Sequence, residues 1–357
     1  MQDKLDLYTD FLLTTMNQAT ATNLSKVVDG AVSHDSITRF LRDNEFSSKD
    51  LWQSVKSLVR HHQTEDACLI FDDTIIEKRY MKENALICWH FDHVQRKAVK
   101  GINLLTAFYH SQHCDQAIPI RIPIAYQLVL KTVLFCDIKS RKEKRISPVN
   151  KNEMLRSMVQ QSIHNQLKFS YVLADSWFAS ADNMRFIHRK KKLFIFDMKK
   201  NRKAALSESD RNAGRWTRIE HMDLPDNRPV KVWLKDLGMP VWMTKQVFKN
   251  EDRTIGLRFL VSNDFSLSDD DFTTLYKKRW SVEEYHKSLK QNAAIAKSPS
   301  RKVKTQSNHL FASILAYVKM EKLKFIQNLN HFAIKSKIYL AASKAAFKEL
   351  NALRAIN

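Results

Sequence analysis

The sequence predicts an α/β protein in which a mixed sheet is flanked by helices and interrupted by a β-rich insertion, with helical regions at both ends. Three observations support this class. Apolar runs of strand length are interspersed with a helical pattern between residues 63 and 199, and short β-like runs fill residues 200–265. Helical periodicity then marks residues 1–62 and the last part of the chain.

The N-terminal region, residues 1–62, is predicted to be helical. A first helix ends near Gly30, a residue that suits the position after a helix, and Ser33 can cap a second helix. This is the outline of a helix-turn-helix that binds DNA, although a plain helical hairpin has the same outline. The apolar faces consist of Leu24, Val27 and Val28 in the first helix and of Ile37, Phe40 and Leu41 in the second.

Two apolar runs end in acidic residues. Residues 67–76 carry Asp72 and Asp73, and residues 169–178 carry Asp175. Apolar runs of this length are typical of strands buried on both faces, and acids at strand ends place a site at the carboxyl edge of a sheet. Between the two runs, the sequence predicts strands over residues 100–109 and 120–134, a basic loop over residues 139–151 and a helix through Met154, Met158 and Ile163.

After the second acidic run, the sequence predicts the insertion and then helices. β-like runs over residues 230–234 and 254–261 belong to the insertion. The three aspartates at residues 269–271 are predicted to cap the next helix, because acids are favourable at helix N-termini. Pro299 follows that helix. Two basic amphipathic helices over residues 306–328 and 331–355 complete the chain.

The charge balance indicates a polyanionic partner. Lys and Arg number 59 against 38 Asp and Glu, which gives a net charge of +21 spread along the whole chain. This distribution favours nucleic acid over a membrane surface. The five glycines form no GxGxxG or Walker-type loop, so no nucleotide cofactor is expected. Four scattered cysteines and the absence of a signal-peptide pattern predict a cytoplasmic, nucleoid-associated protein.

A helical motif over residues 276–290 carries much of the predicted chemistry. At about 100° per residue, four of its polar residues fall within a stripe about 60° wide. Trp280 either stacks on an unpaired base or packs in the core, and Glu284 is expected on the surface. The stripe consists of Tyr276, Arg279, Glu283 and Lys290.

Three acids that are far apart in the sequence complete a predicted metal site. Glu283 joins Asp175 and either Asp72 or Asp73. Carboxylate oxygens are hard ligands that Mg²⁺ and Mn²⁺ prefer. Because two such ions can stabilise both the attacking and the leaving oxygen, the sequence predicts metal-dependent phosphodiester chemistry on DNA.

These motifs resemble those of the DDE transposases of the insertion-sequence-four superfamily, which have an RNase H-like core. The stripe has the Tyr-x2-Arg-x3-Glu-x6-Lys spacing that is the signature of that family. Asp72-Asp73-Thr74 resembles its first-acid motif, and Asp175-Ser176-Trp177-Phe178 is similar to its second. The β-rich insertion between the second and third acids is also expected there. The resemblance covers residues 67 to about 295.

The resemblance implies a role for each site residue. Asp72, Asp175 and Glu283 would ligate two Mg²⁺ or Mn²⁺ ions. Asp72 has the commoner Asp-x-Thr spacing, but Asp73 is also next to a Thr, and the choice between them stays open. The residues expected to bind DNA are Tyr276, Arg279, Trp280, Lys287 and Lys290.

The function implied by the resemblance is that of a transposase. It would cleave the ends of its mobile element and transfer the 3′-hydroxyl ends to target DNA, acting as a homodimer on the terminal inverted repeats. The alternatives are an inactive transposase-derived protein that binds the ends and represses transposition, and a generic RNase H-like nuclease. The expected segments are a DNA-binding region (1–62), the first part of the catalytic core (63–199), the insertion (200–265), the core helix (266–298) and a basic helical region (299–357).

Overall fold

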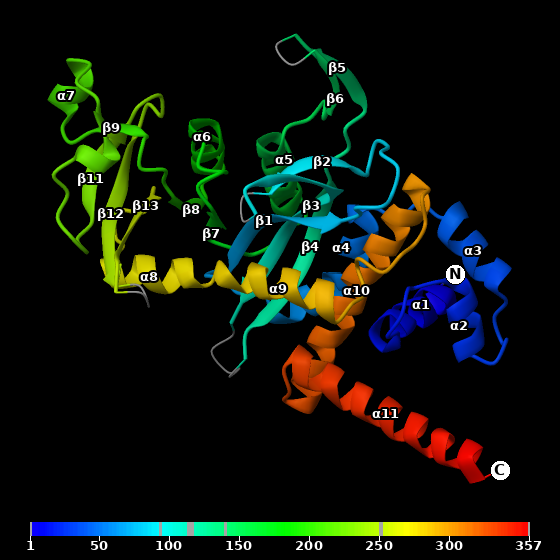
Figure 1. Cartoon of the computed structure of the whole chain (residues 1–357). Helices are drawn as coiled ribbons and strands as arrows, with labels where there is room; N and C mark the ends of the chain where they lie inside the picture. Colours follow the sequence, from blue (N-terminus) through cyan, green and yellow to red (C-terminus); the bar gives the residue numbers. More distant parts are fainter. Residues whose placement is uncertain (1, 93–94, 113–117, 139–140, 250–252, 356–357) are drawn as a thin grey trace.

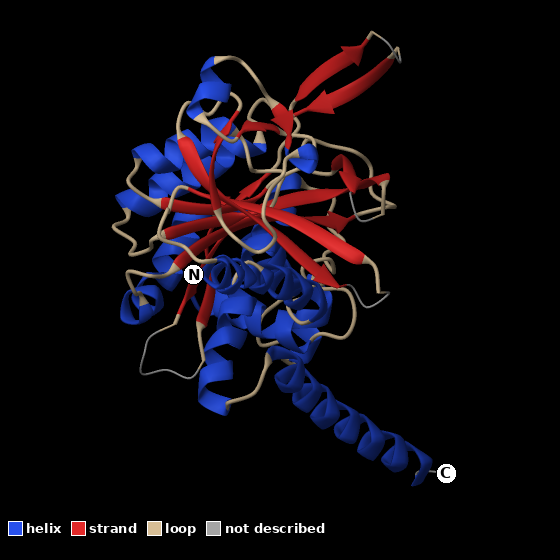
Figure 2. Ribbon diagram, turned by 90° about the vertical axis from the view of Figure 1, so that its left-hand side faces the viewer, coloured by secondary structure: helices blue, strands red, loops and turns tan. Residues whose placement is uncertain are grey.

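A computed structural model describes residues 2–92, 95–112, 118–138, 141–249 and 253–355 (Figure 1). It confirms the predicted α/β class, because a large mixed sheet lies at the centre and helices form both ends of the chain. Figure 2 shows the strands of this sheet running through the body of the molecule with helices around them, while one hairpin and the C-terminal helix project outward.

The central sheet is 11-stranded within the described residues. Its strands are β1 (Cys68–Glu77), β2 (Cys88–Asp92), β3 (Lys97–Ser111), β4 (Ile120–Leu128), β7 (Tyr171–Ala174), β8 (Leu193–Asp197), β9 (Lys203–Ala205), β10 (Thr217–Arg218), β11 (Val230–Leu234), β12 (Pro240–Lys249) and β13 (Ile255–Ser262). The order is β10-β9-β11-β12-β13-β8-β7-β1-β3-β2, and β4 pairs with β3. Strands β1, β7 and β8 are parallel to one another, whereas the other named pairs are antiparallel.

Strand β1 is the buried central strand that the sequence predicts. Its parallel pairing with β7 ends at Phe71 and Ala174, but β1 itself continues beside β3 to Glu77. Asp72 and Asp73 therefore lie within the strand and not at its end, which corrects the prediction. They are nevertheless the first residues of β1 beyond the paired end of β7, where Asp175 follows.

The β-rich segment of residues 200–265 extends this same sheet. Strand β13 pairs with β8, and β12, β11, β9 and β10 follow outward to the edge. Figure 1 shows these strands at one end of the molecule. Short helical elements accompany this half of the sheet: α6 (Ala181–Arg189), α7 (Glu208–Asn212) and the 3₁₀ turn η1 (Ile219–His221).

A separate hairpin of β5 (Val133–Asp137) and β6 (Lys142–Ile146) corrects two predictions. The strand expected over residues 120–134 is divided between β4 and β5. The basic segment expected as a loop over residues 139–151 forms β6 and the start of α5 (Lys151–His164), while its residues 139–140 lie outside the described part. Both hairpin strands are largely exposed, so their sequences lack the alternation of a half-buried strand.

The N-terminal region is helical, as predicted, with α1 (Gln2–Thr14), α2 (Ala21–Val27), α3 (His34–Asp43) and α4 (Ser48–His62). Ser33 caps α3 by accepting a hydrogen bond from the Ser36 amide at 3.3 Å, and Gly30 has a φ of +76° in the turn before it. Leu24 is buried, but Val27 is 64% exposed and does not belong to the predicted apolar face of α2.

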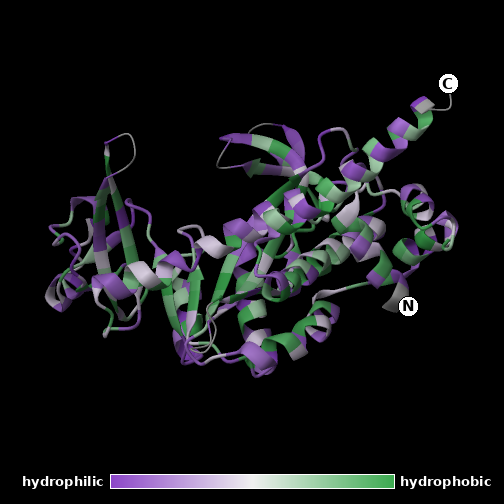
Figure 3. Cartoon of the chain, turned by 90° about the horizontal axis from the view of Figure 1, so that it is seen from below, coloured by the Kyte–Doolittle hydropathy of each residue, from purple (hydrophilic) through white to green (hydrophobic). Residues whose placement is uncertain are grey.

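The two predicted C-terminal helices are α10 (Val303–Gln327) and α11 (His331–Ala355). Helix α10 is buried along much of its length and packs against α1, α3 and β4. Helix α11 projects from the body, and Figure 3 shows hydrophilic and hydrophobic residues alternating along it. No helix in the described ranges is both long enough and apolar enough to span a membrane.

The motif-bearing segment forms two helices where one is predicted. Helix α8 (Asp269–Lys277) and helix α9 (Trp280–Gln291) are separated by a tight turn at Lys278 and Arg279. The amide of Arg279 bonds to the carbonyl of Tyr276 at 3.0 Å, a spacing of three residues that tightens the backbone locally. As predicted, the aspartates cap α8, since Asp271 and Ser268 form a capping box.

Candidate active site

A cleft of about 610 Å³ brings most of the predicted site residues together. It lies where the parallel pairing of β1 and β7 ends, and α9, which packs beside β1, forms its other wall. The three structural elements that carry the acids therefore meet at one place. The predicted residues that line the cleft are Asp72, Asp73, Asp175, Arg279, Glu283, Lys287 and Lys290.

Asp72 and Asp175 form the acidic floor of the cleft. Burial, followed by repulsion from the carboxylates of Asp175 and Asp73, raises the pKa of Asp72 to about 7. Burial also raises the pKa of Asp175, whose Oδ1 accepts the amide hydrogen of Trp177 at 3.0 Å. Negative charge is thus crowded in a place with little solvent, and a bound cation would favour the ionised carboxylates.

Glu283 is paired with Arg279 across one turn of the helix. Arg279 Nη2 donates to Glu283 Oε1 at 2.6 Å, and the arginine side chain is largely buried. Among the described residues, no three His, Cys, Asp or Glu side chains stand close enough together to hold one metal ion. The three acids therefore share a cleft but not a ready-made coordination sphere, and one oxygen of Glu283 is engaged by Arg279.

Asp73 has different partners from Asp72. Lys151 Nζ lies 2.7 Å from Asp73 Oδ1, and Asn103 Nδ2 donates to Asp73 Oδ2 at 2.6 Å. Lys151 is the first residue of α5, and Asn103 lies on β3 beside β1. Both carboxylate oxygens of Asp73 are therefore occupied by protein donors.

His286 adds a neutral imidazole to the α9 wall of the cleft. Its Nδ1 lies 3.8 Å from Asp72 Oδ2, and burial lowers the pKa of the ring to about 3. Its Nε2 is buried and has no hydrogen-bond partner among the described residues. Because His286 follows Glu283 by three residues, both face the same side of the helix.

Two predicted DNA-binding residues do not line the cleft. Tyr276 is 6% exposed, and its hydroxyl donates to the carbonyl of Ala174 at 3.4 Å, so it lies under Arg279 instead of facing a phosphate. Trp280 begins α9 and is 61% exposed, which excludes the core position considered for it. The turn between α8 and α9 separates Tyr276 from the rest of the stripe.

The open side of the cleft is basic. Lys287 and Lys290 are exposed and lie on the same face of α9 as Glu283. Glu284 points elsewhere, as predicted, and forms an ion pair with Arg121. A polyanion that entered the cleft would meet these cations before it reached the acids.

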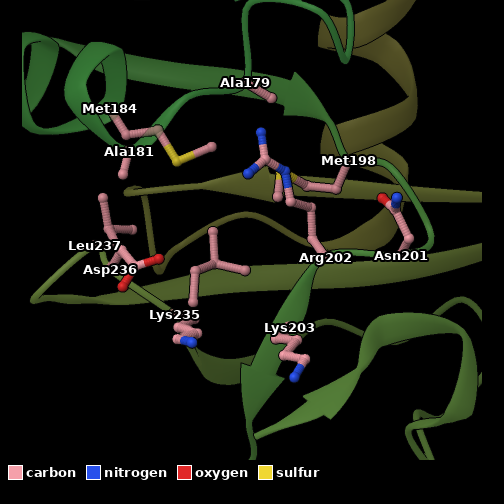
Figure 4. Close-up of a pocket in the computed structure, with 11 residues that line it drawn as sticks. Ala179, Ala181, Met184, Met198, Asn201, Arg202, Lys203, Lys235, Asp236 and Leu237 are labelled. Atoms are coloured by element: carbon pink, nitrogen blue, oxygen red, sulfur yellow. The ribbon is translucent and has the colours of Figure 1, made fainter.

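A smaller cavity of about 230 Å³ lies away from the acids, between α6 and the strands β9 and β11 (Figure 4). Apolar side chains such as Met184 and Leu237 line it together with Arg202, Lys203 and Lys235. None of the predicted site residues contributes to it.

Of the cleft residues that were not predicted from the sequence, three lie beside the acids: His286, Lys151 and Trp177. His286 could have been found from its helical spacing to Glu283. Lys151 ends a basic run interpreted as a loop, and nothing in its spacing identifies it. Trp177 belongs to the second-acid motif but had no predicted functional role, and it is partly buried and lines the cleft beside Asp175.

Comparison with known proteins identifies one family. The family model described as DDE superfamily endonuclease matches residues 1–234 of the chain. No curated protein matches the chain. The matched region contains Asp72 and Asp175 but ends before α8 and α9. Glu283 is therefore included in the candidate site only because it lines the same cleft.

Proposed function

The chain belongs to the DDE superfamily of endonucleases, and we propose that it is a transposase that cleaves the ends of its mobile element and joins the freed 3′-hydroxyl ends to target DNA. DDE endonucleases act on DNA and generally use divalent metal ions. In the first step a water oxygen would attack phosphorus and the bond to the 3′-oxygen would break. In the second step the new 3′-hydroxyl oxygen would attack the phosphorus of a target phosphodiester, and the bond from that phosphorus to the target's own 3′-oxygen would break. The leaving 3′-oxygen would take up the proton that the attacking hydroxyl gives up.

The observation that carries this proposal is the convergence of three acids in one cleft. Asp72 comes from the middle of β1, Asp175 from the end of β7 and Glu283 from α9. These elements are distant in the sequence, so their meeting requires the fold. Acids without a function normally stay exposed to solvent, because burial of an unpaired charge costs free energy. The buried position of Asp72 therefore indicates a function.

The acids fit divalent Mg²⁺ or Mn²⁺. They offer only hard oxygen donors, and burial raises the pKa of Asp72 and Asp175 although the charge of Arg279 lowers it, so their ionised forms are only partly compensated. We propose that Asp72 and Asp175 hold the metal and that Glu283 completes the set for two ions. Bound there, the ions would supply charge relief at the reacting phosphate.

The basic side chains around the cleft would bind the DNA backbone. Arg279 can grip a phosphate through its planar fork once Glu283 is released, and Lys287 and Lys290 add point charges at the mouth. Tyr276 would support Arg279 from below, with the guanidinium 5.5 Å from its ring. Trp280, exposed beside Arg279, is available to stack on an unpaired base.

The spacing Tyr-x2-Arg-x3-Glu-x6-Lys supports membership of the insertion-sequence-four superfamily, with an RNase H-like core. On this basis the N-terminal helices would recognise the terminal inverted repeats, and the C-terminal helices would contribute to a homodimer on paired ends. The proposed segments are residues 1–62 for DNA recognition, 63–199 and 266–298 for the catalytic core, 200–265 for the insertion and 299–357 for the basic helical region.

One observation favours a second candidate, an inactive transposase-derived protein that binds the ends and represses transposition. Arg279 forms an ion pair with Glu283, and the described residues contain no ready-made group of metal ligands. If DNA binding failed to release Glu283, the chain would hold DNA without cutting it.

Glu283→Gln separates these candidates. The wild-type protein should nick a labelled terminal-repeat duplex only with Mg²⁺ or Mn²⁺ and then join the 3′ end to a second duplex. The substitution should abolish both steps while DNA binding in a gel-shift assay persists. Glu284→Gln is the matched control, because Glu284 is the next residue but lies outside the cleft.

Three outcomes would oppose the proposal. Metal-independent nicking would exclude the proposed site. Nicking without preference for terminal repeats, and without strand joining, would indicate a generic nuclease. Binding without any nicking by the wild-type protein would support the inactive candidate.

A further inference from the structure

Lys151 lies in a partly buried network at the floor of the cleft. Its ammonium and the Asp73 carboxylate are 2.7 Å apart, and their side chains are only 21% and 17% exposed. Asn103 occupies the second oxygen of the same carboxylate at 2.6 Å. Asp73 is therefore charge-paired, and each of its two oxygens already has a donor from the protein.

Asp72, the next residue, has no such compensation. Within the described part of the chain, no Lys or Arg nitrogen lies within 4.0 Å of its carboxylate, and the Nδ1 atom of His286 lies 3.8 Å from its Oδ2 atom. Successive residues of a strand point to opposite faces, which explains how two adjacent acids acquire such different surroundings. One acid is left available to a cation and the other is not.

The other side of Lys151 touches the segment that carries Asp175. The Lys151 ammonium lies 4.1 Å from the centre of the Trp177 ring, and the Trp177 amide donates to Asp175 Oδ1 at 3.0 Å. Lys151 thus contacts β1 through Asp73 and the loop after β7 through Trp177. These two segments supply the first two acids of the site.

Helix stability does not explain a lysine at this position. Lys151 is the first residue of α5, where a cation opposes the helix dipole, and the helix is already capped by Asn150 and Glu153. The contacts that the Lys151 side chain makes with Asp73 and Trp177 must therefore outweigh its repulsion by the helix dipole.

We propose that Lys151 is a positioning residue that neutralises Asp73, withdraws it from metal binding and fixes the spacing between Asp72 and Asp175. This inference rests on the proposed function, because it assumes that the cleft binds a divalent cation. It also decides which of the two adjacent acids binds the metal ion. Asp72 is the metal ligand, and Asp73 together with Asn103 holds Lys151 in place.

The proposal predicts opposite effects for the two partners. Asp73→Asn leaves the charge of Lys151 beside the cation and should weaken Mn²⁺ binding about tenfold. Lys151→Met frees the Asp73 carboxylate to compete for the cation, so Mn²⁺ should bind at least as tightly while cleavage falls tenfold or more. In the double variant, Mn²⁺ binding should return to within about threefold of the wild type, because neither an unpaired lysine nor an unpaired carboxylate remains. Cleavage should stay low, because the contacts that fix the spacing between Asp72 and Asp175 are absent.

The experiment is a calorimetric titration of the full chain with Mn²⁺ alone, followed by the nicking assay on the same samples. Lys151→Arg should keep both properties, and Lys168→Met, at an exposed ion pair with Glu65, should change neither. Asp72→Asn should abolish Mn²⁺ binding. Thermal denaturation of each variant would establish that the protein is folded.

Two results would overturn the inference. Loss of Mn²⁺ binding in Asp73→Asn to the extent seen in Asp72→Asn would make Asp73 a ligand. A double variant that cleaved DNA as fast as the wild type would show that Lys151 does not fix the spacing of the acids. If the wild-type protein bound no Mn²⁺ even with a terminal-repeat duplex present, the proposed function itself would fail, and that result is distinct from both.

Discussion

The two adjacent acids of β1 show how much the surroundings of a side chain decide its chemistry. Asp72 is buried beside another acid and a neutral imidazole, and its pKa is raised to about 7. Asp73 is bonded to a lysine and an amide. Two aspartates one position apart therefore differ in what they can bind. The carboxylate of Asp72 is available to a cation, whereas that of Asp73 is already bonded to protein donors.

Asp197, at the end of β8, is predicted to limit stability at neutral pH. Burial raises the pKa of its carboxyl to about 6, whereas an Asp in an unfolded chain titrates near 4. The stability linked to its protonation is complete below about pH 4 and is lost as the pH rises through about 6. Asp197→Asn should therefore raise the free energy of unfolding by about 1–3 kcal/mol at pH 8 and change it little at pH 4.

Urea denaturation across this pH range measures the effect. Asp210→Asn is the control, because the hydrogen bond from the Ser207 hydroxyl lowers the pKa of Asp210 and no gain at high pH is expected. If Asp197→Asn raised the free energy of unfolding by the same amount at pH 4 and at pH 8, the raised pKa of Asp197 would be contradicted.

At the level of elements, the close approach of β1 and β3 requires a glycine. A Cβ at Gly101 would overlap the backbone carbonyl of Ile76 on β1, the strand that carries the first acid. Gly101→Ala should therefore lower the free energy of unfolding by about 2–3 kcal/mol. Chemical denaturation monitored by fluorescence would measure this loss.

Gly256 provides the comparison for that substitution. A Cβ there would meet only the ring of Phe248, which is 40% exposed and free to turn aside. Gly256→Ala should cost about 1 kcal/mol or less. Equal losses in the two variants would mean that the backbone at Gly101 can shift, contrary to our account.

The sequence predicted the elements that bury apolar residues and missed those that do not. Strands β1 and β7 and helix α10 contain long apolar runs, and each is found where expected. The hairpin of β5 and β6 buries neither face, so its residues leave no periodic pattern.

The acids of the candidate site could be predicted from the sequence, but the contacts between its residues could not. The spacing of Arg279, Glu283 and Lys290 fixes their shared helical face, and the cleft confirms that they lie together. The turn that buries Tyr276 depends on packing beneath α8 and α9. The pairing of Lys151 with Asp73 joins residues 78 positions apart, and only the folded sheet brings them into contact.

For the molecule as a whole, the two ends of the chain stabilise each other beside the sheet. Asn308 on α10 donates to the carbonyl of Leu41 at 2.9 Å, and Lys319 forms an ion pair with Asp10 at 2.6 Å. Tyr8 of α1 bonds to His309 at 2.9 Å within the same core. The N-terminal helices are therefore held rigidly beside the sheet by α10.

The hairpin of β5 and β6, in contrast, is predicted to contribute little to stability. Leu134 is 61% exposed and Phe135 is 48% exposed, so their removal loses little buried apolar surface. Replacing residues 133–146 with a short Gly-Ser linker should leave the melting temperature within about 2 °C of the wild type. Differential scanning calorimetry would test this, and a drop of 10 °C would show that the hairpin is part of the folded core.

The most direct test of the account is diffraction from crystals of the protein with a terminal-repeat duplex and Mn²⁺, measured at the manganese absorption edge. We expect anomalous peaks bonded to Asp72, Asp175 and Glu283, with Glu283 released from Arg279 and Asp73 still bonded to Lys151. A cleft without manganese while Glu283 remains paired with Arg279 on bound DNA would contradict a cleaving enzyme.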